Sequence, residues 1–163
     1  MMEISEEHII STIVENKPGV LFRISNMFMR RGFNIESISV GPLEESEYSR
    51  MTITVIGDIK LAEQVSKQLD KMIDVIEVSH LIRNKSVIRE LALIRINAEN
   101  SKDRSDIMSY ADVFRGRVVD VTPTNIMIEI TGAPDKINAF IEIISDFKIE
   151  ELARTGMTAL PRG

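Results

Sequence analysis

Apolar and polar residues alternate with two different periods along the first half of the chain, and each period predicts a different element. The segments predicted as strands are 8–14, 35–40, 50–56 and 73–82, and those predicted as helices are 20–31 and 61–72. Gly32 stands where a helix C-cap glycine belongs, and Gly41-Pro42 is expected to end the second strand. The order β-α-β-β-α-β is the split βαβ arrangement of ferredoxin-like domains.

The second half repeats this order after a polar break at Arg83-Asn84-Lys85-Ser86. Its predicted strands are 87–98, 118–121, 126–130 and 149–153, its apolar helical stripes are 107–114 and 137–147, and 99–103 and 154–163 are expected to be a polar loop and a tail. The sequence therefore predicts an α+β chain of two tandem ferredoxin-like domains, at 1–83 and 84–163. Small domains with open four-stranded sheets leave apolar surface and strand edges uncovered, so we expect a homodimer.

Composition excludes several classes of function. The 163 residues are 44% hydrophobic, enough for a core, and the formal net charge of −5 gives no reason to expect nucleic acid as a partner. The chain has no cysteine, which excludes disulfides, thiolate chemistry and cysteine-based zinc sites. His8 and His80 are far apart in sequence and predict no metal site. Residues 1–7 do not resemble a signal peptide and no apolar run could span a bilayer, so we expect a cytoplasmic protein without a membrane partner.

The strand-to-helix turn Asn16-Lys17-Pro18-Gly19-Val20-Leu21 is the best candidate for ligand binding. Backbone N–H groups at a helix start are unpaired and attract anions, and Gly19 lets a ligand approach the backbone closely. A free amino acid needs such donors for its carboxylate, acceptors for its ammonium group and an apolar pocket, which Val20, Leu21 and Ile35 could line. Asn16 can both donate and accept.

A purely structural interpretation of this turn uses the same residues. Asn is a good N-cap and Pro favours the first helical position, so the residues by themselves favour an ordinary turn over ligand binding. Asn34 after Gly32 can likewise be a turn residue. Arg23, Arg30 and Arg31 give a cationic helix face typical of a solvated surface, and Arg115-Gly116-Arg117 is a weak anion site. No phosphate-binding loop, catalytic triad or acid–base pair of carboxylates is recognisable, so we expect no catalytic residue.

Several segments together resemble one family, the small regulatory subunit of acetolactate (acetohydroxyacid) synthase, whose N-terminal domain is an ACT domain. The segments similar to this family are Glu15–Arg23, Arg31–Ile38, Ser49–Ile53, Phe114–Pro123 and Arg154–Gly156. The resemblance covers almost the whole chain.

The resemblance implies a non-catalytic subunit that binds and activates the large catalytic subunit, with thiamin diphosphate, magnesium and FAD on that partner and no cofactor on this chain. It also implies feedback inhibition in branched-chain amino acid biosynthesis (valine, leucine, isoleucine), usually by valine bound at the ACT dimer interface. The implied effector residues are Asn16, Lys17, Pro18, Gly19, Val20 and Leu21 from one protomer and Asn34 and Ile35 from the other. The alternatives are a stand-alone paired-ACT sensor with a non-enzyme partner, and an enzyme in its own right.

Overall fold

A computed structural model describes residues 5–163. Residues 1–4, part of the segment for which the sequence predicts no signal peptide, lie outside the described residues. The chain divides into two units, residues 1–87 with 157–163, and residues 88–156. The tail 157–163 belongs to the first unit, whereas the sequence placed all of 84–163 in the second domain.

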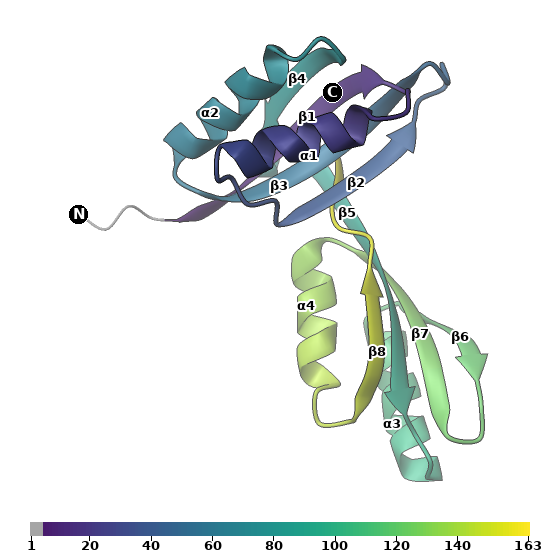
Figure 1. The fold of residues 1–163 in the computed structure, drawn as a ribbon. Helices are drawn as coiled ribbons and strands as arrows, with labels where there is room; N and C mark the ends of the chain where they lie inside the picture. Colours follow the sequence, from purple (N-terminus) through teal and green to yellow (C-terminus); the bar gives the residue numbers. More distant parts are fainter. Residues whose placement is uncertain (1–4) are drawn as a thin grey trace. The chain divides into compact units, whose positions relative to one another are not determined.

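The first unit is a four-stranded antiparallel sheet with the strand order β2-β3-β1-β4, and Figure 1 shows α1 and α2 on the same face of this sheet. Its elements are β1 (Glu6–Glu15), α1 (Val20–Arg30), β2 (Ser37–Pro42), β3 (Tyr48–Gly57), α2 (Ile59–Asp70) and β4 (Val75–Leu81), followed by a 3₁₀ turn (Arg83–Lys85). The predicted β-α-β-β-α-β order is confirmed. Gly41 and Pro42, predicted to end the second strand, are the last two residues of β2. A proline can belong to this strand because β2 lies at the sheet edge.

Alternation along the strands places the core of the first unit between the sheet and the two helices. Its buried members are Ile10, Val14, Val20, Ile24, Phe28, Met51, Ile53, Val55, Val65 and Leu69. The helix α1 ends as predicted at Gly32, whose φ of 68° is the left-handed conformation that glycine adopts readily. The N–H of Phe33 bonds the carbonyl of Phe28 at 3.0 Å and that of Gly32 bonds Met29 at 3.2 Å, which is a Schellman motif.

The second unit has the same architecture, with the sheet order β6-β7-β5-β8. Its elements are β5 (Ser86–Asn97, which begins in the first unit), α3 (Ser101–Val113), β6 (Arg117–Val121), β7 (Asn125–Gly132), α4 (Pro134–Ile143) and β8 (Ile149–Arg154). The helix α3 begins inside the predicted polar loop 99–103, because the Asn100 side chain accepts a hydrogen bond from the N–H of Asp103 at 2.8 Å and caps the helix. The core contains Ile94, Ile107, Ile128, Ile137 and Phe140, among others.

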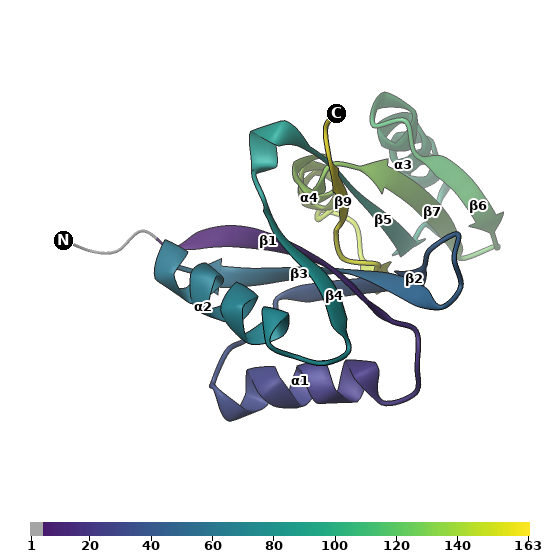
Figure 2. The same cartoon turned by 90° about the horizontal axis from the view of Figure 1, so that it is seen from above.

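The predicted tail contains one further strand, β9 (Thr158–Pro161), which pairs with β5. Figure 2 shows β9 on the face of the first sheet opposite to α1. Met157 and Ala159 are buried there, and the N–H of Arg162 donates to the carbonyl of Lys85 at 2.8 Å. The tail therefore covers part of the face of the first sheet that the helices leave open. Within residues 5–163, no helix has the length and apolar character needed to cross a bilayer.

Candidate functional site

The turn between β1 and α1 opens the first helix with glycine. Gly19 is the N-cap residue, its φ is 87°, and no side chain caps the helix. Asn16 is therefore not the N-cap of α1, and Pro18 is not its first helical residue. A left-handed glycine replaces them, because the chain must turn sharply between the last strand residue, Glu15, and the first helical residue, Val20.

This arrangement leaves main-chain donors unpaired at the start of α1. The backbone N–H groups of Gly19, Leu21 and Phe22 have no hydrogen-bond acceptor within the described part of the chain, and that of Val20 makes only a 3.4 Å contact with the carbonyl of Lys17. Leu21 and Phe22 are exposed. Unpaired amides at the positive end of a helix dipole attract a carboxylate or another anion.

Asn16 fixes the other side of this turn to the loop between β2 and β3. Its Nδ2 donates to the carbonyl of Ser46 at 2.8 Å, and its backbone N–H donates to the carbonyl of Glu47 at 2.7 Å. The side-chain oxygen of Asn16 then remains as an acceptor that an ammonium group can use. Lys17 is exposed and pairs with Glu15 at 2.9 Å, an ion pair that raises the pKa of Lys17.

Arg23 lies beside Gly19 and is fixed by Asp74, a residue that sequence reasoning did not single out. Its Nε and Nη2 donate to the two carboxylate oxygens at 2.6 and 2.9 Å, and a Cβ added at Gly19 would lie 2.9 Å from Nη1. The hydrogen bond from Arg23 lowers the pKa of the buried Asp74 carboxyl, and the same bond raises the pKa of Arg23. Asp74 therefore holds the guanidinium next to Gly19, and Nη1, which makes no hydrogen bond to Asp74, is the nitrogen nearest to the turn.

The remaining predicted site residues divide into two groups. Val20 is in the core and Ile35 packs against the core, so of the three predicted pocket residues only Leu21 presents its side chain to solvent. Asn34 and Ile35 follow the C-terminal end of α1, whereas the turn precedes its N-terminal end. Nine residues of α1, Phe22 to Arg30, separate the two groups within one chain, so a single copy does not bring them together.

The two histidines meet in the first sheet, although they are far apart in sequence. Because β1 and β4 are neighbours, His8 Nδ1 lies 3.3 Å from His80 Nε2, and the His8 Nε2–H donates to the carbonyl of Gly57 at 3.1 Å. Burial lowers the pKa of His80, and the neighbouring His8 lowers it further. No third potential ligand joins them in residues 5–163, where no group of three or more His, Asp or Glu could hold a metal ion.

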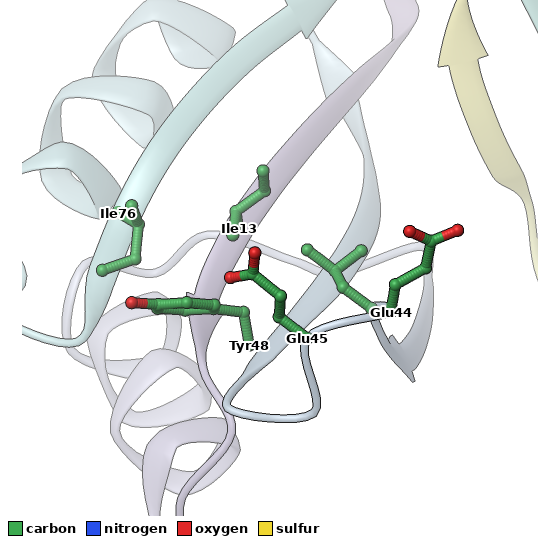
Figure 3. A pocket seen from close by; sticks show the side chains of 6 residues that line it. Ile13, Glu44, Glu45, Tyr48 and Ile76 are labelled. Atoms are coloured by element: carbon green, nitrogen blue, oxygen red, sulfur yellow. The ribbon is translucent and has the colours of Figure 1, made fainter.

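The described part of the first unit has cavities on its surface, and two of them lie near predicted site residues. One, of about 460 Å³, is lined by Ile13, Leu43, Glu44, Glu45, Tyr48 and Ile76 (Figure 3). The other, of about 390 Å³, is lined by Met27, Arg30, Arg31, Gln68, Lys71 and Met72. The second contains part of the predicted cationic face of α1. The first lies next to the loop that Asn16 holds.

Comparisons with known proteins identify the family to which the chain belongs. A family model described as the AHAS small subunit-like ACT domain matches residues 10–77, and one described as the small subunit of acetolactate synthase matches residues 89–163. The probable acetolactate synthase small subunit of Methanothermobacter thermautotrophicus is 50% identical over 97% of this chain and 94% of its own length. The isozyme 3 small subunit of Salmonella typhimurium is 42% identical over 95% of each chain.

A solved structure extends the similarity to three dimensions. The crystal structure of the acetolactate synthase small subunit from Thermotoga maritima matches with a TM-score of 0.89 and 42% identity over 97% of this chain and 98% of that one. The first unit is thus an ACT domain, and the chain as a whole is an α+β protein with two ferredoxin-like domains, as the sequence predicted. The chain belongs to the family of acetolactate synthase small subunits. The resemblance seen in the sequence is confirmed.

Proposed function

We propose that this chain is the non-catalytic regulatory subunit of an acetolactate synthase, in the biosynthesis of the branched-chain amino acids. It activates a large catalytic subunit, which carries the thiamin diphosphate, magnesium and FAD, and it confers feedback inhibition by valine or a related amino acid. The observation that carries the proposal is the uncapped start of α1, where the N–H groups of Gly19, Leu21 and Phe22 have no acceptor within residues 5–163 and the guanidinium of Arg23, held by Asp74, lies next to Gly19. These donors suit the carboxylate of a zwitterion.

The effector site needs a second copy of the chain. Asn34 and Ile35 lie beyond the far end of α1, so they reach the turn of Asn16 only from another protomer. Two further features support a homodimer: β2 is an edge strand, and Phe22 and Met29 on α1 are each 72% exposed. Exposed apolar side chains and unpaired strand edges are typical of interfaces between copies.

Regulation then follows from linkage. An effector held between two protomers stabilises one geometry of the dimer, and it changes the partner only as far as its affinities for the two states differ. A coupling of about 1–3 kcal/mol, the usual range, corresponds to a several-fold to hundred-fold change in affinity.

The test is calorimetric titration of the purified chain with valine, leucine and isoleucine, alone and with the catalytic subunit. Saturable binding of one of them is expected, and in the holoenzyme Asn16→Ala should abolish valine inhibition while activation of the large subunit is retained. Equal valine sensitivity of mutant and wild-type holoenzymes would contradict the site. A stand-alone sensor is the better interpretation if no thiamin-diphosphate enzyme co-purifies from native extract, and the isolated chain should not condense pyruvate.

A further inference from the structure

None of the residues that line the cavity of about 460 Å³ on the first unit belongs to the proposed effector site. Ile13 of β1, Ile76 of β4 and Leu43 provide its aliphatic surface, and Tyr48 at the start of β3 provides an aromatic ring. Figure 3 shows the side chains of Tyr48, Glu45, Ile13 and Ile76 around the cavity, with the ring of Tyr48 seen nearly edge-on. Glu44 completes the lining from the same loop.

Both carboxylates are available to a ligand. Within residues 5–163, the side chains of Glu44 and Glu45 take part in no ion pair or hydrogen bond, and both residues are exposed. Carboxylates that line the same cavity as an aromatic ring favour a cation, because the ring face is electron-rich and the carboxylates supply the opposite charge. Aliphatic walls beside them suit the methylene stem of a long cationic side chain.

The loop that carries these carboxylates is held in place. The N–H of Leu43 donates to the carbonyl of Tyr48 at 2.9 Å, and the N–H of Tyr48 donates to the carbonyl of Glu45 at 3.0 Å. Asn16 adds its two hydrogen bonds to Ser46 and Glu47 from the effector turn. The loop that lines the cavity is therefore preorganised. It is also hydrogen-bonded to Asn16, which the proposed function places against the effector.

We propose that this cavity receives a basic side chain, Lys or Arg, presented by the catalytic subunit. The inference rests on the proposed function for the existence of that partner. A protein segment fits better than a free small amine, because Ile76 is 56% exposed and the acidic loop is open to solvent, so a small ligand would stay largely uncovered. The link through Asn16 gives the effector turn a direct mechanical connection to this docking site.

The first experiment tests the cation site on the full chain without the partner. Butylguanidinium is titrated while the ring signals of the two tyrosines, Tyr48 and Tyr110, are followed by NMR. The Tyr48 signals should shift and those of Tyr110, in the second unit, should not. Glu44→Gln/Glu45→Gln should weaken binding roughly five-fold or more, whereas Glu47→Gln, on the same loop but outside the lining, should not change it. An unmoved Tyr48 signal overturns the proposal.

The second experiment measures the dissociation constant of the reconstituted complex. Glu44→Gln/Glu45→Gln should weaken the complex roughly ten-fold at low salt and reduce its salt dependence, while Glu47→Gln binds like wild type. Tyr48→Leu should weaken it about two- to five-fold more than Tyr48→Phe, which keeps the ring. Unchanged affinity of the double variant overturns the assignment to the catalytic subunit, even if butylguanidinium binds. If the wild-type chain binds no catalytic subunit, the proposed function is refuted instead. Retained valine binding is the control that shows that the double variant is folded.

Discussion

The hydroxyl of Ser39 on the edge strand β2 donates a hydrogen bond to the backbone carbonyl of Met157 at 2.9 Å, across 118 positions of sequence. Both residues belong to the first unit, so the end of the chain is part of the ACT domain structure. Buried polar residues of the same sheet, Ser11 and Thr52, pair opposite each other on this face, which Met157 and Ala159 help to cover. The tail therefore contributes to the stability of the ACT domain.

A charged residue at the buried tail position should destabilise the first unit. Ala159→Asp places a carboxylate where only 3% of the residue is exposed, and we expect a loss of about 2–3 kcal/mol in the free energy of unfolding. Leu160→Asp, at a neighbouring exposed position, is the control and should cost less than about 0.5 kcal/mol. Urea unfolding is measured in a Tyr110→Phe background. Tyr48 is then the remaining tyrosine, and its signal reports the unfolding of the first unit. Equal midpoints for the two variants would show that the tail does not stabilise it.

The strand β9 shows why part of this fold could not be predicted from sequence. The strands and helices of both units were predictable because their apolar residues recur over many positions, whereas β9 has four residues and one buried side chain. The start of α3 was missed for a related reason: its first turn is hydrophilic, and its buried stripe begins only at Ile107. Short or solvated elements depend on caps and distant partners, which periodicity does not record.

The candidate site was predictable to the same limited degree. The composition of the turn indicated unpaired amides near Gly19, and the structure has them. The left-handed N-cap conformation of Gly19 could not be predicted, because Asn16 and Pro18 are themselves good helix-start residues. The pair of Arg23 and Asp74 joins residues 51 positions apart, and neither composition nor spacing indicates such a contact.

Gly19→Ala should disturb the site more than a comparable change at the other end of α1. At both Gly19 and Gly32 the positive φ makes alanine strained by about 1–2 kcal/mol. At Gly19 the added Cβ would also lie 2.9 Å from Nη1 of Arg23, whereas at Gly32 no atom is within 4 Å. We therefore expect a larger fall in melting temperature for Gly19→Ala than for Gly32→Ala, together with weaker effector binding in calorimetry. Equal melting temperatures would mean that Arg23 moves aside without cost.

Asp74 should contribute to stability only above the pH at which it becomes protonated. Arg23 lowers the pKa of Asp74 in the folded state, so the folded chain holds the carboxylate form more strongly than the unfolded chain, whose carboxyl titrates near about 3.9. This stabilisation is complete above the unfolded-state pKa and is lost as the pH falls through the lower folded-state pKa. Asp74→Asn should lower the urea midpoint at pH 7, and its midpoint should fall less than that of wild type between pH 5 and pH 3.

The exposed Asp70, at the end of α2, provides the matched control for this pH series. Asp70 forms no ion pair within residues 5–163, so Asp70→Asn should keep the wild-type dependence of the urea midpoint on pH. A wild-type slope in Asp74→Asn as well would show that the ion pair with Arg23 does not stabilise the fold.

The histidine pair predicts a second pH dependence, in a higher range. Burial and the charge of His8 lower the pKa of His80, so below the ordinary value of about 6.5 the unfolded chain binds more protons than the folded chain. Stability should therefore fall as the pH decreases from 7.5 to 5.5. His80→Gln should reduce this dependence, because it removes the histidine whose pKa is lowered in the folded chain and leaves His8 as the remaining histidine. Urea midpoints at pH 7.5, 6.5 and 5.5 measure it, and a variant with the same slope as wild type would assign the effect to other groups.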